Sequence, residues 1–291
     1  MNGQIFKMNI IGCGKAARTV AQAWIQTGRV EVQAVCNRSL SSAEDAIRFL
    51  GQGRPVNSWQ EFPRAQLLLM GVPDKAIAPL AAQVAEEGIV HPGMIIFHLS
   101  GALDSRVLAP FKRCGAFVAS VHPVMTFADP HRAAQEFHRC SCSLEGDPEA
   151  THLLANLVRS AGARVLHIEP GVKPLYHAGL VMTCNYLVAL LEAGLQALEQ
   201  AGISREVALS VIQPLVEETL RNCWKWGTAG ALTGPIARGD VEIVSQELQI
   251  LKGSPQLAEI YRSLGRLTLE IARKQSRLSP QEEASLRRIL E

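Results

Sequence analysis

The sequence of 291 residues has almost no excess of charge of either sign and no basic run. Lysine and arginine number 29 and aspartate and glutamate 27, so the formal net charge is +2. Nucleic-acid-binding domains usually concentrate positive charge on one face or along one segment. We therefore expect no nucleic-acid partner.

Long apolar runs and a secretory leader are also missing. No run reaches the ~20 apolar residues that a membrane-spanning helix needs, and the opening residues MNGQIFKMNI contain no hydrophobic leader region. The seven cysteines are scattered, and an odd number suits reduced thiols better than a disulfide framework. These features predict a cytoplasmic protein that does not associate with a membrane.

A metal site is a weak alternative. Cys140 and Cys142 lie close to His138, and thiolate and imidazole are common zinc ligands. However, Cys-x-Cys spacing also places two side chains on one face of a strand. We expect no metal.

The order of the predicted elements indicates two domains. Up to about residue 168 strands alternate with helices, which favours a mostly parallel, doubly wound α/β sheet. After Gly171 the apolar residues recur at helical spacing and no strand is evident. We expect a Rossmann-type nucleotide-binding domain over residues 1–169 and an all-α domain over residues 170–291. The second begins with one helix over 173–201, followed by a helix from Ser204 that is kinked at Pro214.

The stretch 9–23, NIIGCGKAARTVAQA, carries the main functional signal. An apolar strand breaks at Gly12 and Gly14 and continues as a helix past Ala17, which is the pattern GxGxxA. Gly12 allows the tight turn, Gly14 allows the backbone to approach a pyrophosphate, and Ala17 allows close packing of helix on strand. The pattern also occurs at turns that bind nothing, but its place at the first strand favours a nucleotide site.

The residues that follow the second strand, 30–36, indicate which dinucleotide cofactor binds. The strand is followed by Asn37, Arg38 and Ser39, where an acidic residue would bind the ribose hydroxyls of NAD and an arginine can pair with a 2′-phosphate. NADP(H) is the preferred interpretation. The alternative is that Arg38 is a solvated charge and Asn37 caps a turn. The expected cofactor-binding residues are Gly12, Cys13, Gly14, Lys15, Ala16, Ala17, Asn37, Arg38, Ser39, Val72, Pro73, Ser100 and Gly101.

Other strand ends supply candidate catalytic groups, because ligands of open α/β sheets bind at the carboxyl ends of the strands. Ser100 and Gly101 are expected near the nicotinamide, and Asp74 is expected to cap a helix. His122 directly precedes a proline, which favours extended backbone. The His122 side chain either projects into the cleft or packs in the core, and the sequence does not decide between these two positions.

The helical half adds more candidates. Lys173, His177 and Asn185 lie four and eight residues apart, which places them on one face of a helix at the domain boundary. Thr233 lies in the polar loop ALTGPIARGD over 231–240. The competing interpretation is that the histidine and asparagine side chains are buried and hydrogen-bonded inside a helical core. We take His177 as the first candidate for acid/base catalysis, with Lys173 next, His122 as a further candidate, and Ser100, Asn185 and Thr233 as orienting groups.

Together these motifs resemble one family. The GxGxxA turn, Asn37-Arg38-Ser39, HLSGAL at 98–103, VHPVMTF at 121–127, the helix from Tyr176 to Asn185 and the 231–240 loop are similar to those of Rossmann-like oxidoreductases with a C-terminal domain of unknown function. The family is similar to deazaflavin-dependent NADP oxidoreductases, pyrroline-5-carboxylate reductase and ketopantoate reductase. Its C-terminal domain resembles that of 6-phosphogluconate dehydrogenase. Related enzymes pair a lysine with an asparagine on the interdomain helix, whereas here His177 stands four residues after Lys173.

The resemblance implies an NADPH-dependent reductase of a small carbonyl or imine compound, such as a 2-keto acid, with the substrate between the domains. The alternative is a sensor that binds NADP(H) without turnover. A homodimer is also expected, because the helix from Lys173 is apolar around most of its circumference and such a helix must be buried.

Overall fold

The computed structural model describes residues 4–291. The chain forms two compact units, Met1–Val181 and Met182–Glu291. The division falls later than the boundary expected after residue 169, because the helix α7 (Lys173–Leu180) belongs to the first unit, where the Lys173 side chain is buried.

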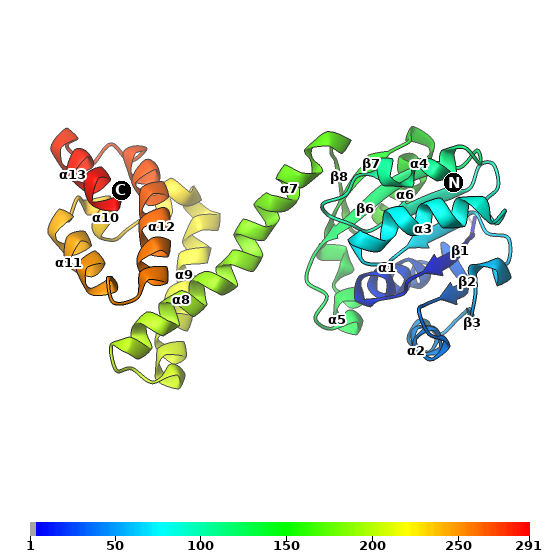
Figure 1. Ribbon diagram of the computed structural model, residues 1–291, viewed down its shortest axis with the longest axis horizontal. Coiled ribbons are helices and arrows are strands. Elements are labelled where there is room, and N and C mark those ends of the chain that lie inside the picture. The colour runs from blue at the N-terminus through cyan, green and yellow to red at the C-terminus, as the bar shows by residue number, and fades with distance from the viewer. Residues whose placement is uncertain (1–3) are drawn as a thin grey trace. The chain divides into compact units, whose positions relative to one another are not determined.

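The first unit is built on one eight-stranded sheet (Figure 1) with the order β3-β2-β1-β4-β5-β6-β7-β8. Neighbouring strands are parallel except β6 and β7, which are antiparallel. The expected mostly parallel, doubly wound α/β sheet is confirmed. The strands are β1 (Phe6–Ile11), β2 (Val30–Cys36), β3 (Arg54–Val56), β4 (Leu67–Met70), β5 (Ile95–His98), β6 (Phe117–Val124), β7 (Ser141–Gly146) and β8 (Arg164–His167).

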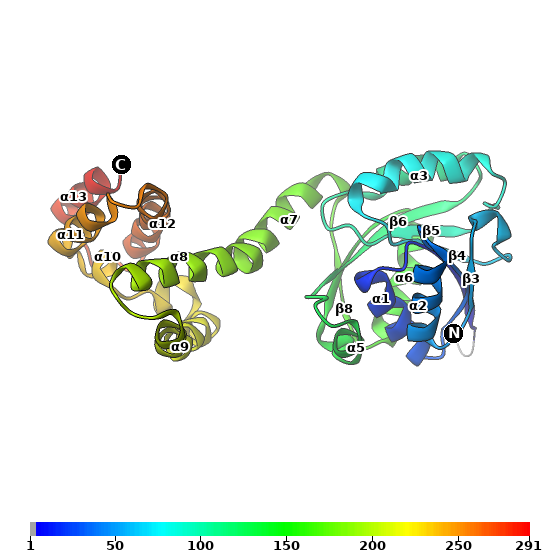
Figure 2. The same cartoon turned by 60° about the horizontal axis from the view of Figure 1, so that its bottom comes forward.

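Both faces of this sheet are covered, so its central strands are apolar on both sides. Leu67 and Leu69 belong to the core under α1, α2 and α6. Leu68 and Met70 point to the opposite face, into the core under α3 and α4, as the two-residue period of a strand requires. Figure 2 shows the first set of helices and α3 on the two sides of the sheet. The helices are α1 (Lys15–Gln26), α2 (Leu40–Leu50), α3 (Asp74–Glu86), α4 (Ala109–Lys112), α5 (Pro130–Gln135) and α6 (Pro148–Ser160).

The helical prediction for the second half is also confirmed, with two differences. The single helix expected over 173–201 consists of α7, a π-helical segment Val181–Asn185 and α8 (Tyr186–Gln200). The break inside α9 (Arg205–Ala231) falls at Gly227, whose φ is +70°, rather than at the expected Pro214. Glycine adopts that left-handed conformation without a steric penalty. The remaining helices are α10 (Pro235–Arg238), α11 (Val241–Leu251), α12 (Pro255–Arg273) and α13 (Pro280–Leu290).

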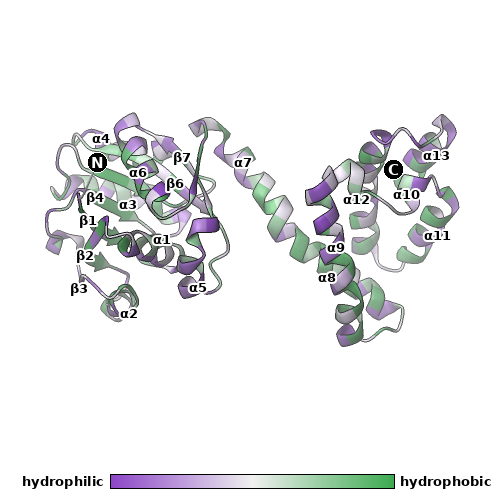
Figure 3. Cartoon of the chain, turned by 180° about the vertical axis from the view of Figure 1, so that it is seen from behind, coloured by the Kyte–Doolittle hydropathy of each residue, from purple (hydrophilic) through white to green (hydrophobic). Residues whose placement is uncertain are grey.

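Much apolar surface of the second unit is exposed. Its core is formed by side chains of α10 to α13, whereas within α8 and α9 the buried residues are Leu195 and Ala208. Hydrophobic residues recur along α7 and α8 (Figure 3). The helical stretch Pro170–Gln200 is long and apolar enough to cross a membrane, contrary to the expectation that no such stretch exists, and 6% of its most apolar window is buried.

Candidate functional site

The glycine turn has the geometry that the motif predicts. Gly12 has φ +82°, and a Cβ there would lie 2.5 Å from Val72 Cγ1, so neither the backbone conformation nor the space allows a side chain. The Gly12 N–H donates to the Cys36 carbonyl at 2.8 Å, which joins the turn to β2. Gly14 is the N-cap of α1 and lies against open space. The first N–H groups of α1 have no acceptor within the helix, and a Cβ added at Gly14 would meet no atom within 4 Å.

Asn37 supports this turn from the end of β2. Its Oδ1 accepts the Cys13 N–H at 2.7 Å, and its Nδ2 donates to the Ser42 carbonyl at 2.8 Å. Asn37 therefore connects the glycine turn to the first turn of α2 and leaves the adjacent Arg38 exposed. Ser39 is the N-cap of α2, and its hydroxyl accepts the Ser42 N–H at 3.3 Å. A guanidinium, a hydroxyl and a helix N-terminus together favour a phosphate group.

Lys15, Ala16 and Ala17 form the first turn of α1. Ala17 is buried against the sheet, as the third position of the motif requires. The Lys15 ammonium donates to the Ala128 carbonyl at 3.1 Å and thereby ties α1 to the loop after β6. The backbone of Lys15 therefore belongs to the glycine turn, whereas its ammonium contacts the loop after β6.

The ends of β4 and β5 are joined by a hydrogen bond that the sequence did not predict. Pro73 is the N-cap of α3, and Asp74, expected as the cap, instead accepts the Ser100 hydroxyl at 2.8 Å. The Ser100 oxygen also accepts the N–H groups of Ala102 and Leu103, at 3.2 and 2.9 Å. The Ser100 hydroxyl thus holds the loop after β5, and Val72 and Pro73 lie beside it at the end of β4.

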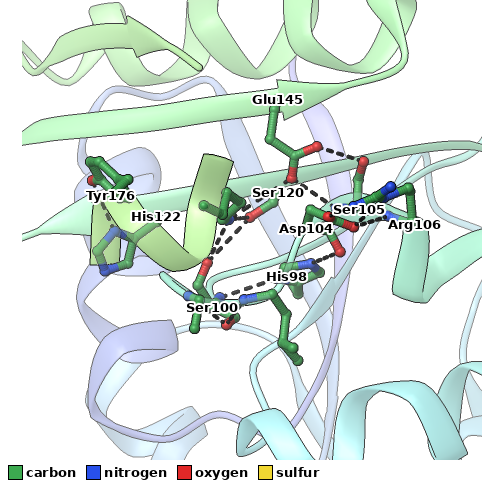
Figure 4. A network of polar contacts seen from close by, with 12 residues as sticks. His98, Ser100, Asp104, Ser105, Arg106, Ser120, His122, Glu145 and Tyr176 are labelled. Atoms are coloured by element: carbon green, nitrogen blue, oxygen red, sulfur yellow. Dashed lines mark hydrogen bonds and ion pairs between the residues drawn. The ribbon is translucent and has the colours of Figure 1, made fainter. Parts of the chain in front are cut away.

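Two imidazoles lie against the buried Gly101, and a tyrosine contacts one of them. A Cβ on Gly101 would lie 2.6 Å from His177 Cδ2 and 2.7 Å from His122 Nε2, so both imidazoles rest on the backbone at this point. The centroids of the two rings are 6.1 Å apart and their planes are inclined at 65°. Tyr176 is hydrogen-bonded through its hydroxyl to His122 Nδ1 at 3.1 Å (Figure 4). All three side chains are partly accessible.

Lys173, in contrast, is buried. Its ammonium donates to the Ser100 carbonyl at 2.7 Å and to the Ser120 hydroxyl, and it lies 3.9 Å from Glu145 Oε1. The exposed fraction of the Lys173 side chain is 0%. The structure therefore places Lys173 beside the cluster at Gly101 but gives its ammonium no path to a ligand.

Burial and the Lys173 charge together set the protonation of two histidines. Burial lowers the pKa of His122 to about 4, with further lowering by Lys173 and His177. Burial, then the Lys173 charge, lowers the pKa of His98 to about 4. Both imidazoles are neutral near pH 7. For His98 this agrees with its hydrogen bonds, since Nδ1 accepts the Ser100 N–H at 3.1 Å.

Asn185 and Thr233 belong to the second unit, where both are exposed. The π-helical segment Val181–Asn185 separates His177 from Asn185, so the regular spacing that placed them on one face is interrupted. Thr233 lines a cavity of about 410 Å³ within the second unit, together with Glu247 and Tyr261. The roles of Asn185 and Thr233 stay predictions.

Two important residues were missed from the sequence. Tyr176 was part of a motif but was given no role, and its bond to His122 joins α7 to β6. Glu145 is not among the candidate residues that the sequence suggests. The signal for Glu145 was a charged residue inside an otherwise apolar strand, because a buried charge nearly always has a partner.

Comparisons with known proteins agree with this architecture. Residues 2–123 match the Rossmann-like domain family, and residues 140–268 match DUF2520, a domain of unknown function. No curated protein sequence matches the chain significantly.

Solved structures share the fold over nearly the whole chain. One from Bacteroides fragilis, provisionally titled an NADP oxidoreductase, is 22% identical, covers 91% of this chain and 98% of its own, and has a TM-score of 0.73. An imine reductase from Pseudomonas sp. is 17% identical, covers 99% and 100%, and has a TM-score of 0.63. The pyrroline carboxylate reductase of Plasmodium falciparum, solved with NADP bound, is 11% identical, covers 93% and 100%, and has a TM-score of 0.56. At these identities the likeness establishes the fold, and with the two domain matches it shows that the chain joins a Rossmann-like domain to a DUF2520 domain, as its motifs predicted.

Proposed function

We propose that the protein is an NADP-dependent oxidoreductase that reduces a small carbonyl or imine metabolite, with a 2-keto acid such as ketopantoate as one candidate. The observation that carries this proposal is the phosphate-binding geometry at the ends of β1 and β2, where Gly12 and Gly14 form the turn and Asn37 leaves Arg38 and Ser39 exposed beside it. The names of the structurally similar proteins support the same cofactor and reaction class.

The cofactor residues are proposed from this geometry. The turn from Gly12 to Ala17 would hold the pyrophosphate, Arg38 and Ser39 the 2′-phosphate, and the segments Val72-Pro73 and Ser100-Gly101 would border the nicotinamide. NADPH supplies a hydride when bound. The protein must then orient the acceptor and provide a proton.

His177 is the proposed proton donor, since it is partly accessible and lies over Gly101 at the expected edge of the sheet. His122 lies on the same glycine, but its lowered pKa leaves little imidazolium at neutral pH. Asn185 and Thr233 are proposed to orient the substrate.

Binding measurements test the cofactor. We expect NADPH to bind about ten-fold to a hundred-fold more tightly than NADH, because a 2′-phosphate gains charge-assisted hydrogen bonds. Arg38→Ala should remove most of this preference in a fluorescence titration. Arg48→Ala is the matched control, because Arg48 lies near the other end of α2 and pairs with Asp45. Equal affinities for the two cofactors, or an unchanged preference in Arg38→Ala, would reject the NADP assignment.

Turnover separates an enzyme from a cofactor sensor. NADPH oxidation should be observed with some member of a panel of 2-keto acids and cyclic imines. A protein that binds NADPH tightly but oxidises it with no member of the panel would instead be the sensor.

We further propose that the protein is a homodimer formed through its second unit and that it works in the cytoplasm. The uncovered apolar side chains of α8 and α9 support the first proposal. The second is supported by the cysteines, which are all free thiols in the described residues 4–291.

A further inference from the structure

A row of polar side chains crosses β5, β6 and β7 at the level where β5 ends. His98 is the register partner of Ser120 in the parallel pair β5–β6, and Ser120 is the partner of Glu145 in the antiparallel pair β6–β7. Residues in register share a face of the sheet. This is the face that α3 and α4 cover, and all three side chains are buried there. The neighbouring residues on this face, Ile96 and Val118, are apolar core residues.

Glu145 is held in a defined position within this row. Its Oε1 accepts the Ser105 N–H at 2.8 Å and its Oε2 accepts the Ser105 hydroxyl at 2.7 Å. Ser105 begins the turn Ser105–Leu108, which packs over the strand ends. Figure 4 shows Glu145 and Ser105 joined on one side of Ser120 and the loop at Ser100 on the other.

Lys173 completes the row from outside the sheet. It is the first residue of α7, and its ammonium reaches the Ser100 carbonyl, the Ser120 hydroxyl and Glu145. The Lys173 ammonium thus connects three elements of the first unit: the loop after β5, β6 and β7. One helical turn later His177 rests on Gly101.

Burying the charge of Lys173 or of Glu145 alone is unfavourable, so each charge of the pair compensates the other. Burial lowers the pKa of Lys173 to about 8, while the nearby carboxylates of Glu145, Asp104 and Asp74 act to raise it. Burial raises the pKa of Glu145, and Ser105 and Lys173 oppose that shift. Removing one partner of such a pair leaves an uncompensated buried charge, whereas replacing both by neutral groups of similar volume is often tolerated.

We propose that Lys173 and Glu145 are positioning residues, a buried clamp that fastens the start of α7 to β6, β7 and the loop after β5 and so holds His177 over Gly101 and Tyr176 against His122. In this role Lys173 takes no part in proton transfer, although the sequence suggested it as an acid/base. The turnover readout below rests on the proposed reductase function. The stability and resonance readouts do not.

The test is a double-mutant cycle of Lys173→Met and Glu145→Gln. Each single variant should lower the melting temperature and cut kcat about 10- to 100-fold, because displacing the catalytic groups by about 1 Å costs rate on that scale, while the NADPH dissociation constant changes less than about two-fold. The double variant should recover most of the melting temperature and return kcat to within about ten-fold of the wild type. Lys112→Met is the matched control, since Lys112 pairs with Asp147 in the same unit at 2.6 Å but is half exposed.

NMR of the imidazole resonances provides a readout that needs no substrate. The His122 and His177 signals should shift in Lys173→Met, return toward the wild-type positions in the double variant, and stay unchanged in Lys112→Met.

The outcomes separate the two proposals. A double variant that recovers stability but stays as slow as Lys173→Met would make Lys173 a proton donor and overturn the positioning role. A double variant that recovers neither stability nor the resonances would overturn the clamp itself. If the wild type oxidises no NADPH, the proposed function fails, while melting and NMR still decide on the clamp.

Discussion

At the scale of single residues, the cluster at Gly101 assigns different tasks to two histidines. His122 is hydrogen-bonded to Tyr176 and has a pKa of about 4, so it is neutral at physiological pH. His177 lies beside it on the same glycine and is partly accessible. A neutral, anchored imidazole suits orientation, and an accessible one suits proton transfer.

His177→Gln should therefore reduce turnover about 10²- to 10⁴-fold, the usual cost of losing a general acid, and leave NADPH affinity nearly intact. Steady-state kinetics and cofactor titration measure the two effects. His138→Gln, at an exposed histidine bonded to the Gln135 carbonyl, is the control. Full turnover in His177→Gln would move the donor role to another group of the cluster. Joint loss of thermal stability and cofactor binding would make His177 a core residue.

At the scale of elements, the row across β5, β6 and β7 makes the first unit sensitive to acid. The His98 ring can accept the Ser100 N–H through Nδ1 only when that nitrogen carries no proton. Its folded pKa of about 4 lies below the usual 6.5. Between these two pH values the unfolded chain binds more protons than the folded one, so acidification favours unfolding.

We expect the free energy of unfolding to fall as the pH drops from about 6.5 to 4, with His98 contributing on the order of 3 kcal/mol. Urea denaturation at a series of pH values measures this dependence. His98→Asn, which keeps an acceptor for the Ser100 N–H but does not titrate, should show a shallower slope, while His138→Gln should keep the wild-type slope. Identical slopes in His98→Asn and the wild type would mean that His98 is not held neutral by the fold.

At the scale of the whole molecule, the apolar surface of the second unit needs cover. Leu215 and Trp224 on α9 have exposed fractions of 67% and 82%, and Val188 on α8 has 69%. Exposed apolar patches of this kind usually mark an association surface. A membrane is the less suitable cover for the stretch Pro170–Gln200, because Lys173 near its start is buried against Glu145. A second copy of the chain is the expected partner.

Sedimentation at micromolar concentration should thus give twice the monomer mass of 31.6 kDa. Leu215→Glu should shift the protein toward the monomer, because it places a charge in the apolar interface. Ile5→Glu, at a residue 54% exposed in the first unit, should leave the dimer intact. A wild-type monomer at this concentration would contradict the proposal, and co-sedimentation of that monomer with lipid vesicles would identify a membrane as the cover.

The sequence by itself determined those features that depend on neighbours along the chain. The glycine turn at Gly12, the Asn37-Arg38-Ser39 segment and the alternation of strands and helices are local patterns, because turn conformation, helix period and strand period are set within a few residues. The capping box that begins α13, in which the Ser279 hydroxyl accepts the Glu282 N–H and the Glu282 carboxylate accepts the Ser279 N–H, is another local pattern. From these patterns the Rossmann fold, the helical second half and the conformation of the glycine turn could be predicted, whereas the role of that turn in cofactor binding stays a prediction.

Only the tertiary structure decided how distant segments meet. The direction and register of β7 place Glu145 opposite Ser120, and no local pattern encodes that pairing. The spacing from Lys173 to His177 is the same whether the Lys173 side chain faces a substrate or the sheet. In the structure the Lys173 side chain is buried beside Glu145. Tyr176 gained its partner in the same way. Side-chain roles at the site follow from strand register and burial, which arise when elements far apart in sequence pack together.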